Sequence, residues 1–173
     1  MTATQSIFLI GPMGVGKTTI GRFLAGELNR DFYDTDRVVE ERTGADIPWI
    51  FDVEGEAGFR KREEAVCAEL CNEHSLVIAT GGGIIVNEAN RRRIRRNGFV
   101  VYLSADVDRF VERTSKDTRR PLLQTANPRE VIEQLLAVRD PLYREVADVV
   151  IDTESNSPKH ISERIIEAFN ERA

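Results

Sequence analysis

One short motif constrains the fold of this chain more than any other feature: GPMGVGKT, residues 11–18. It matches the pattern G-x-x-x-x-G-K-[ST] at every required position, between a short apolar run, Ser6–Ile10, and a helical pattern, Thr18–Asn29. Glycines let the backbone wrap closely around phosphate oxygens, and the positive end of the following helix favours an anion. A glycine-rich turn that matches by chance is the weaker alternative. The motif predicts a site for a nucleoside triphosphate, with ATP and Mg²⁺ as the expected ligands.

The residue types in this motif suggest separate tasks for its members. Lys17 can reach the β- and γ-phosphates and take part in catalysis, and the Thr18 hydroxyl can ligate Mg²⁺. Successive backbone N–H groups of the loop can point inward at the phosphates. The residues expected to contact the nucleotide here are Gly14, Val15, Gly16, Lys17, Thr18 and Thr19.

Short β-rich runs alternate with amphipathic helical patterns along the chain. The expected strands are Ser6–Ile10, Asp31–Tyr33, Leu76–Ala79, Phe99–Leu103 and Asp148–Ile151. The expected helices include Thr18–Asn29, Glu56–Asn72, Glu88–Arg96 and Arg129–Val146, and Asn127 and Ser157 each stand as a cap before a first-turn proline. This alternation predicts an α/β fold in which a parallel sheet is covered on both faces.

The least regular part of the chain is the charged segment Ser115–Asn127. A segment of this kind within a compact domain is often a functional lid. An ordinary surface loop is an equally good interpretation of the pattern alone.

Two carboxylates, Asp34 and Asp36, follow the second expected strand. Ligands of open α/β sheets bind at the carboxyl ends of the strands, so both side chains should face the cleft. Asp34 could support the Mg²⁺ shell, and Asp36 could orient or deprotonate an acceptor hydroxyl. The alternative is that the pair simply caps the following helix.

Further candidates for binding an acceptor lie later in the chain. Three consecutive glycines, Gly81, Gly82 and Gly83, end another expected strand and would let a substrate lie against bare backbone. Arg60 begins a long helical pattern, and Arg139 precedes Pro141, where a kink could aim it inward. A flexible turn and solvated arginines are the ordinary alternatives. Together, these residues indicate an acceptor that carries hydroxyls and a negative charge.

Composition excludes several other classes of protein. The 173 residues suffice for one domain, and no stretch approaches the ~20 apolar residues of a membrane span, so a cytoplasmic protein is expected. The net charge of −5 does not favour nucleic-acid binding. The arginine-rich run 91–96 could bind a nucleic acid, but a solvated helix face is the better interpretation.

These residues closely resemble the shikimate kinases over essentially the whole chain. The resemblance rests on IFLIGPMGVGKTTIGR, DFYDTD, TGADIPWIFDVEGEAGFRKRE, ATGGG, RRPLL and RDPLYREVAD in this order. It implies a three-layer α/β/α P-loop kinase with a five-stranded parallel sheet, which transfers the γ-phosphoryl group of ATP to the 3-hydroxyl of shikimate in chorismate biosynthesis. It further implies one monomeric domain over residues 1–173, with an acceptor-binding region at about 34–61 and a lid at about 112–126.

The resemblance also implies roles for single residues. Asp36 would bind shikimate hydroxyls, Arg60 and Arg139 its carboxylate, and the glycines 81–83 its ring face, with Gly82 donating from its backbone. Arg120 in the lid motif would reach over ATP and stabilise the transferring charge. Asn156 is the nearest match to a family position beside the adenine, although its side chain is shorter than the Gln or Arg usually found there.

Two other functions deserve comparison with this prediction. A gluconate kinase of the same fold would share the phosphate-binding loop and a lid, but not the full set of acceptor residues. A non-catalytic ATP-binding module would show damage at Lys17, Asp36 or Arg120, and all three are intact.

Overall fold

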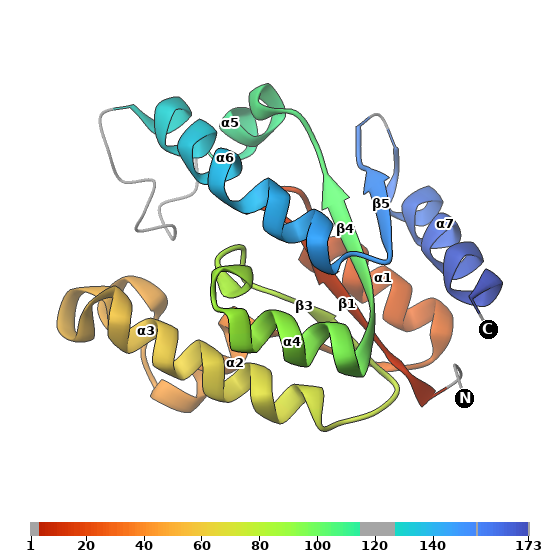
Figure 1. The fold of residues 1–173 in the computed structure, drawn as a ribbon, viewed down its shortest axis with the longest axis horizontal. Coiled ribbons are helices and arrows are strands. Elements are labelled where there is room, and N and C mark those ends of the chain that lie inside the picture. Colours follow the sequence, from red (N-terminus) through yellow and green to blue (C-terminus); the bar gives the residue numbers. More distant parts are fainter. Residues whose placement is uncertain (1–3, 115–126, 155, 173) are drawn as a thin grey trace.

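The computed structural model describes residues 4–114, 127–154 and 156–172, without the side chains of residues 113 and 114. Its centre is a parallel sheet of five strands (Figure 1). Across the sheet the strands are β2 (Asp31–Asp34), β3 (Leu76–Ala79), β1 (Ser6–Ile10), β4 (Gly98–Ser104) and β5 (Val149–Asp152). All five expected strands form, each within a residue of its predicted bounds.

Strand β1 shows how the sequence covers both faces of the sheet. All five of its residues are buried, as expected for a central strand with helices on both sides. Phe8 and Ile10 belong to the hydrophobic cluster on one face, whereas Ile7 and Leu9 belong to the cluster on the other. Alternate side chains therefore serve two separate cores.

Helices form the two outer layers (Figure 1). Residues of α2 (Thr35–Thr43), α3 (Ile47–Cys71) and α4 (Glu88–Asn97) contribute to one cluster, and residues of α1 (Lys17–Leu28) and α7 (Pro158–Glu171) to the other. Helix α6 (Pro128–Val146) contributes Ile132 to one cluster and Tyr143 to the other, so it bridges the two layers. Helix α5 (Val107–Thr114) packs against α6, and a short 3₁₀ turn, η2 (Ile84–Val86), precedes α4.

Several helix boundaries test the sequence predictions directly. The caps form as expected: Asn127 accepts a hydrogen bond from the backbone of Glu130, and Ser157 accepts one from His160. Helix α6 continues through Pro141 without ending. The sequence patterns missed α2, α5 and the first part of α3. Helices α2 and α5 are short and mostly polar, and the first part of α3 is apolar but buries only Ile50.

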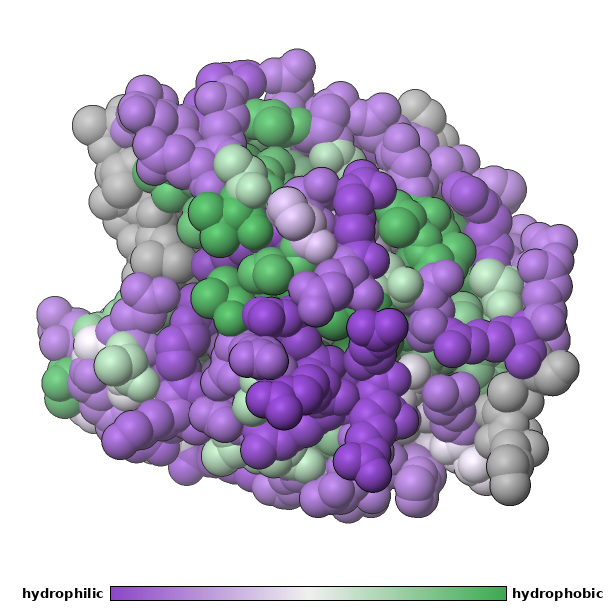
Figure 2. All heavy atoms as spheres, viewed as in Figure 1, coloured by the Kyte–Doolittle hydropathy of each residue, from purple (hydrophilic) through white to green (hydrophobic). Residues whose placement is uncertain are grey.

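The arginine-rich run lies on α4, on a strongly hydrophilic face of the molecule (Figure 2). Three of its arginines have acidic neighbours within 4 Å, namely Arg91 with Glu145, Arg92 with Glu88 and Arg93 with Glu64. This arrangement is typical of a solvated helix face. No helix in the described part of the chain is long and apolar enough to span a membrane.

Candidate active site

The phosphate-binding motif forms a loop between β1 and α1. Gly16 caps the first turn of α1 in a left-handed conformation, with φ 98°, which residues with a side chain rarely adopt. Lys17 is buried, and its ammonium group donates hydrogen bonds of 2.6 Å and 2.8 Å to the carbonyl oxygens of Gly11 and Pro12. These bonds hold the positive charge beside the loop.

Thr18 links this loop to the end of the neighbouring strand β2. Its hydroxyl donates a hydrogen bond of 2.7 Å to Oδ2 of Asp34. The other carboxylate oxygen of Asp34 accepts from the backbone N–H groups of Asp36 and Arg37, at 3.0 Å and 3.3 Å. Asp34 therefore caps α2, which was the alternative interpretation of this residue, and it also presents an oxygen beside Thr18.

A pocket of about 230 Å³ joins the loop to the predicted acceptor side. Its walls include Asp36 and Gly82, from the predicted acceptor side, together with the loop residues Gly14, Gly16, Lys17, Thr18 and Thr19. Asp34 also lines it. Residues from three strand ends thus surround one space, as expected at the carboxyl edge of a parallel sheet.

The three glycines that follow β3 lie against the predicted acceptor-binding side chains. A methyl group added to Gly81 would collide with the carboxylate of Asp36, and one added to Gly83 would collide with the guanidinium of Arg60. At Gly82 it would lie 3.7 Å from Nη1 of Arg139. The absence of side chains at Gly81 and Gly83 therefore leaves room for Asp36 and Arg60, and Arg139 approaches the same backbone segment.

Arg139 and Tyr143 connect α6 to the same turn. Arg139 is only 5% exposed, and the hydroxyl of Tyr143 donates a hydrogen bond of 2.5 Å to the carbonyl oxygen of Gly82. Burial raises the pKa of the Tyr143 hydroxyl, which keeps it protonated and able to donate. The glycine turn is thus anchored to the helix that carries Arg139.

Glu63 belongs to this site, although the sequence did not single it out. Its side chain is buried and accepts a hydrogen bond of 2.8 Å from Nη1 of Arg60. Burial raises the pKa of Glu63 to about 7, against the opposing attraction of Arg60. Its spacing of three residues from Arg60 on a helix was the available signal, because residues so spaced are neighbours.

A second pocket, of about 220 Å³, adjoins the other side of the loop. It shares Gly16 and Thr19 with the first pocket and is also lined by Val15, Asn156 and Arg109. Arg109 donates a hydrogen bond of 2.6 Å to the carbonyl oxygen of Thr153, and the Asn156 amide donates one of 2.9 Å to that of Glu154. The sequence patterns did not identify Arg109 as a site residue. The one feature that could have indicated it is its position shortly after the end of β4.

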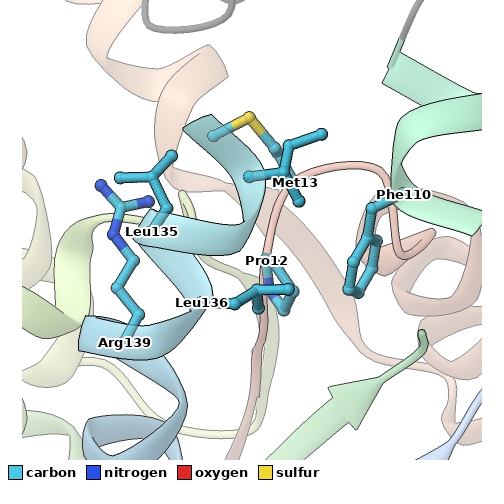
Figure 3. Close-up of a pocket in the computed structure, with 7 residues that line it drawn as sticks. Pro12, Met13, Phe110, Leu135, Leu136 and Arg139 are labelled. Atoms are coloured by element: carbon cyan, nitrogen blue, oxygen red, sulfur yellow. The ribbon is translucent and has the colours of Figure 1, made fainter. Parts of the chain in front are cut away.

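A narrow apolar crevice separates the loop from α5 and α6 (Figure 3). Pro12 and Met13 of the loop meet Phe110 of α5 and Leu136 of α6 there. Its free volume is about 10 Å³, which leaves no room for a substrate. The crevice is a packing contact that fixes the loop against these two helices.

Part of the predicted site lies outside the described residues. Arg120 and most of the expected lid, residues 115–126, belong to this part. Every other site residue predicted from the sequence lies in one of the two pockets or against the glycine turn.

Comparison with known proteins identifies the family. The family model for shikimate kinase matches residues 13–170. A shikimate kinase of Vibrio parahaemolyticus is 54% identical over 172 residues, which cover 99% of this chain and 100% of that protein. This chain belongs to the shikimate kinase family. The family's enzymes are ATP-dependent phosphotransferases, as the sequence predicted for this chain.

Solved structures agree with this membership. The structure of a shikimate kinase from Acinetobacter baumannii in complex with shikimate has a TM-score of 0.95 at 47% identity, covering 97% of this chain and 94% of that one. A gluconokinase from Sinorhizobium meliloti has a TM-score of 0.65 at 17% identity, covering 98% and 93%. At that identity the gluconokinase shares the fold alone.

Proposed function

We propose that this protein transfers the γ-phosphoryl group of ATP to the 3-hydroxyl of shikimate, giving shikimate 3-phosphate and ADP, a step of chorismate and aromatic amino-acid biosynthesis. One observation carries this proposal: a single pocket is lined both by the phosphate-binding residues Lys17 and Thr18 and by the acceptor-side residues Asp36 and Gly82. Donor and acceptor would meet there, and holding two reactants together is the main contribution to a reaction with a loose phosphoryl-transfer transition state.

On the donor side, the loop 14–16 would bind the phosphates through its backbone N–H groups at the start of α1. Lys17 would neutralise the charge that develops as the γ-phosphoryl group leaves. The second pocket would take the nucleoside. There the planar guanidinium of Arg109 and the ring of Pro158 offer surfaces for stacking a base, and Asn156 offers an amide.

Mg²⁺ would bind beside Thr18 and Asp34. Their oxygens lie 2.7 Å apart, and both residues line the main pocket. Among the described residues, no group of three or more His, Cys, Asp or Glu side chains could hold a metal ion. Two protein oxygens suit Mg²⁺, which usually keeps several waters and takes the remaining ligands from substrate phosphates. Held by Thr18 and Asp34, such a metal would neutralise negative charge on the nucleotide phosphates during transfer.

On the acceptor side, Asp36 would hydrogen-bond shikimate hydroxyls and orient the one that attacks. Arg60 and Arg139 would bind the carboxylate, because a guanidinium presents two parallel donors that match its two oxygens. Both arginines lie against the glycine turn, so the ring of the acceptor would rest on Gly81–Gly83. A site of this kind would discriminate against acceptors that lack these groups, because such acceptors could not form the charge-assisted hydrogen bonds with Asp36, Arg60 and Arg139.

The whole chain, residues 1–173, would form one kinase domain that acts as a cytoplasmic monomer. The acceptor-binding region would span about 34–61 and the lid about 112–126. Arg120 of the lid would reach over ATP and stabilise the transferring charge. Closure of the lid would exclude water, which otherwise competes as acceptor.

The proposal is tested by measuring ADP release from ATP and Mg²⁺ with added shikimate, with added gluconate and with no acceptor. We expect strong stimulation by shikimate alone. Stimulation by gluconate alone would instead support the gluconate kinase alternative. ADP release that does not depend on either acid would contradict the assignments of Asp36, Arg60 and Arg139.

A further inference from the structure

Helix α3 is interrupted near its middle. Gly55 has φ 74° and ψ 176°, which is not a helical conformation, and so it divides the helix into two parts. We call residues 47–54 the outer part and residues 56–71 the inner part. The inner part carries Arg60 and Glu63 of the proposed acceptor site.

Two side-chain contacts cross this interruption. The rings of Phe51 and Phe59 lie with their centroids 5.1 Å apart. On the solvent side, the guanidinium of Arg62 donates two hydrogen bonds to the carboxylate of Glu54, at 2.9 Å from Nε and 2.7 Å from Nη2. Glu54 and Arg62 are eight residues apart, which in a continuous helix would be about 12 Å along the axis. The two contacts therefore depend on the bend at Gly55.

Gly58 allows the second contact to form. A methyl group added to Gly58 would lie 2.5 Å from Cβ of Glu54 and 3.1 Å from its Oε2. The side chain of Glu54 thus lies across the backbone of the inner part and reaches Arg62 one turn further on. A bidentate pair fixes direction as well as distance, which a single hydrogen bond does not.

A chain of contacts leads from this pair to the proposed acceptor site. Phe51 of the outer part touches Phe59, and the guanidinium carbon of Arg60 lies 5.2 Å from the centre of the Phe59 ring. Arg60 in turn lies against Gly83 and pairs with Glu63. A change in the angle between the two parts would therefore move Phe51 and remove support from Arg60.

From this geometry we propose that Glu54 and Arg62 are positioning residues for acceptor binding, which hold the outer part of α3 at the angle that supports Arg60. The inference rests on the proposed function, in which Arg60 binds the carboxylate of shikimate. The pair is partly exposed, with 29% of the Glu54 side chain and 40% of the Arg62 side chain accessible. Exposed ion pairs contribute little to the global stability of a protein. Removal of this pair should therefore change the angle between the two parts of α3 more than the free energy of unfolding.

The test compares Glu54→Gln, Arg62→Met and the exchanged double variant Glu54→Arg/Arg62→Glu. We expect each single change to raise the KM for shikimate about fivefold, which corresponds to the upper end of the interaction energies of exposed ion pairs. The KM for ATP and the melting temperature should stay unchanged. The double variant should recover much of the loss. A matched control is Glu69→Gln, because Glu69 of α3 also makes a bidentate, exposed pair, with Arg42 of α2, and this pair does not cross the interruption.

Trp49 supplies a second measurement. It is the only tryptophan of the chain and lies in the outer part, with 48% of its surface exposed. We expect the fluorescence anisotropy of Trp49 to fall in both single variants and to stay unchanged in Glu69→Gln. Unchanged KM for shikimate and unchanged anisotropy in both single variants would overturn the positioning role. Lack of shikimate-dependent ADP release by the unaltered protein would instead overturn the proposed function.

Discussion

The hydroxyl of Thr18 donates a hydrogen bond of 2.7 Å to Oδ2 of Asp34, and this bond joins the first turn of α1 to the end of β2. The two residues are 16 positions apart in the sequence. The bond brings together the two oxygens proposed to ligate Mg²⁺. It also connects the phosphate-binding loop to α2, whose first turn carries Asp36.

Replacing Asp34 by Asn should separate its two roles. Asn caps helices as well as Asp does, so we expect the free energy of unfolding to change by less than about 0.5 kcal/mol. Loss of the negative charge should weaken Mg²⁺ binding, so that the rate saturates only at a higher Mg²⁺ concentration. Initial rates over a Mg²⁺ titration, alongside urea unfolding, measure both effects. Thr18→Ser, which keeps the hydroxyl, is the control and should behave like the unaltered protein.

Lys17→Ala should nearly abolish turnover and leave the fold intact. Lys17 is the cation that lies beside the loop, and loss of one group that stabilises transition-state charge costs roughly 10²–10³-fold in kcat. Circular dichroism should be unchanged, while steady-state kinetics should show the loss in kcat. Activity equal to that of the unaltered protein would contradict the assignment of the phosphate-binding loop.

Gly83→Ala should affect the acceptor and spare the nucleotide. The backbone at Gly83 has φ −91° and ψ −1°, which alanine tolerates, but the added methyl group would collide with the Arg60 guanidinium. Displacement of Arg60 by about 1 Å should raise the KM for shikimate roughly tenfold to a hundredfold, with the KM for ATP unchanged. Gly26→Ala is the matched control, because apart from the adjacent backbone of its own helix no described atom lies within 4 Å of its added methyl group. It should leave both KM values unchanged.

Glu63 should make stability depend on pH near neutrality. Its pKa of about 7 in the folded protein exceeds the ordinary value of 4.5, so the folded state holds this proton more tightly. Its contribution to stability is therefore complete below pH 4.5 and is lost as the pH rises through about 7.

The measurement is the free energy of unfolding at intervals from pH 4 to pH 8, for the unaltered protein and for Glu63→Gln. The difference between the two should change by up to about 3 kcal/mol across this range, with the unaltered protein losing stability toward higher pH. A constant difference would mean that Glu63 is ionised throughout, held by Arg60.

Local sequence determined much of this protein. The phosphate-binding loop and the five strands follow from glycine geometry, apolar runs and helix caps, which are properties of neighbouring residues. Asp36 and Gly82 both follow the ends of strands, and parallel strands present their carboxyl ends at the same edge of the sheet. The sequence therefore also predicted that these two residues face one space, and both line the main pocket. Helix α2, which the sequence pattern did not show, is mostly polar and buries few side chains.

Only the tertiary structure decided which distant groups touch. Burial raises the pKa of Glu63, and Arg109 lines the second pocket. Neither property can be predicted from a local sequence pattern. The bend at Gly55 likewise pairs Glu54 with Arg62, because packing rather than helix periodicity sets the angle between the two parts of α3. Burial and contact between segments remote in sequence arise when the layers assemble, so only the assembled fold reveals them.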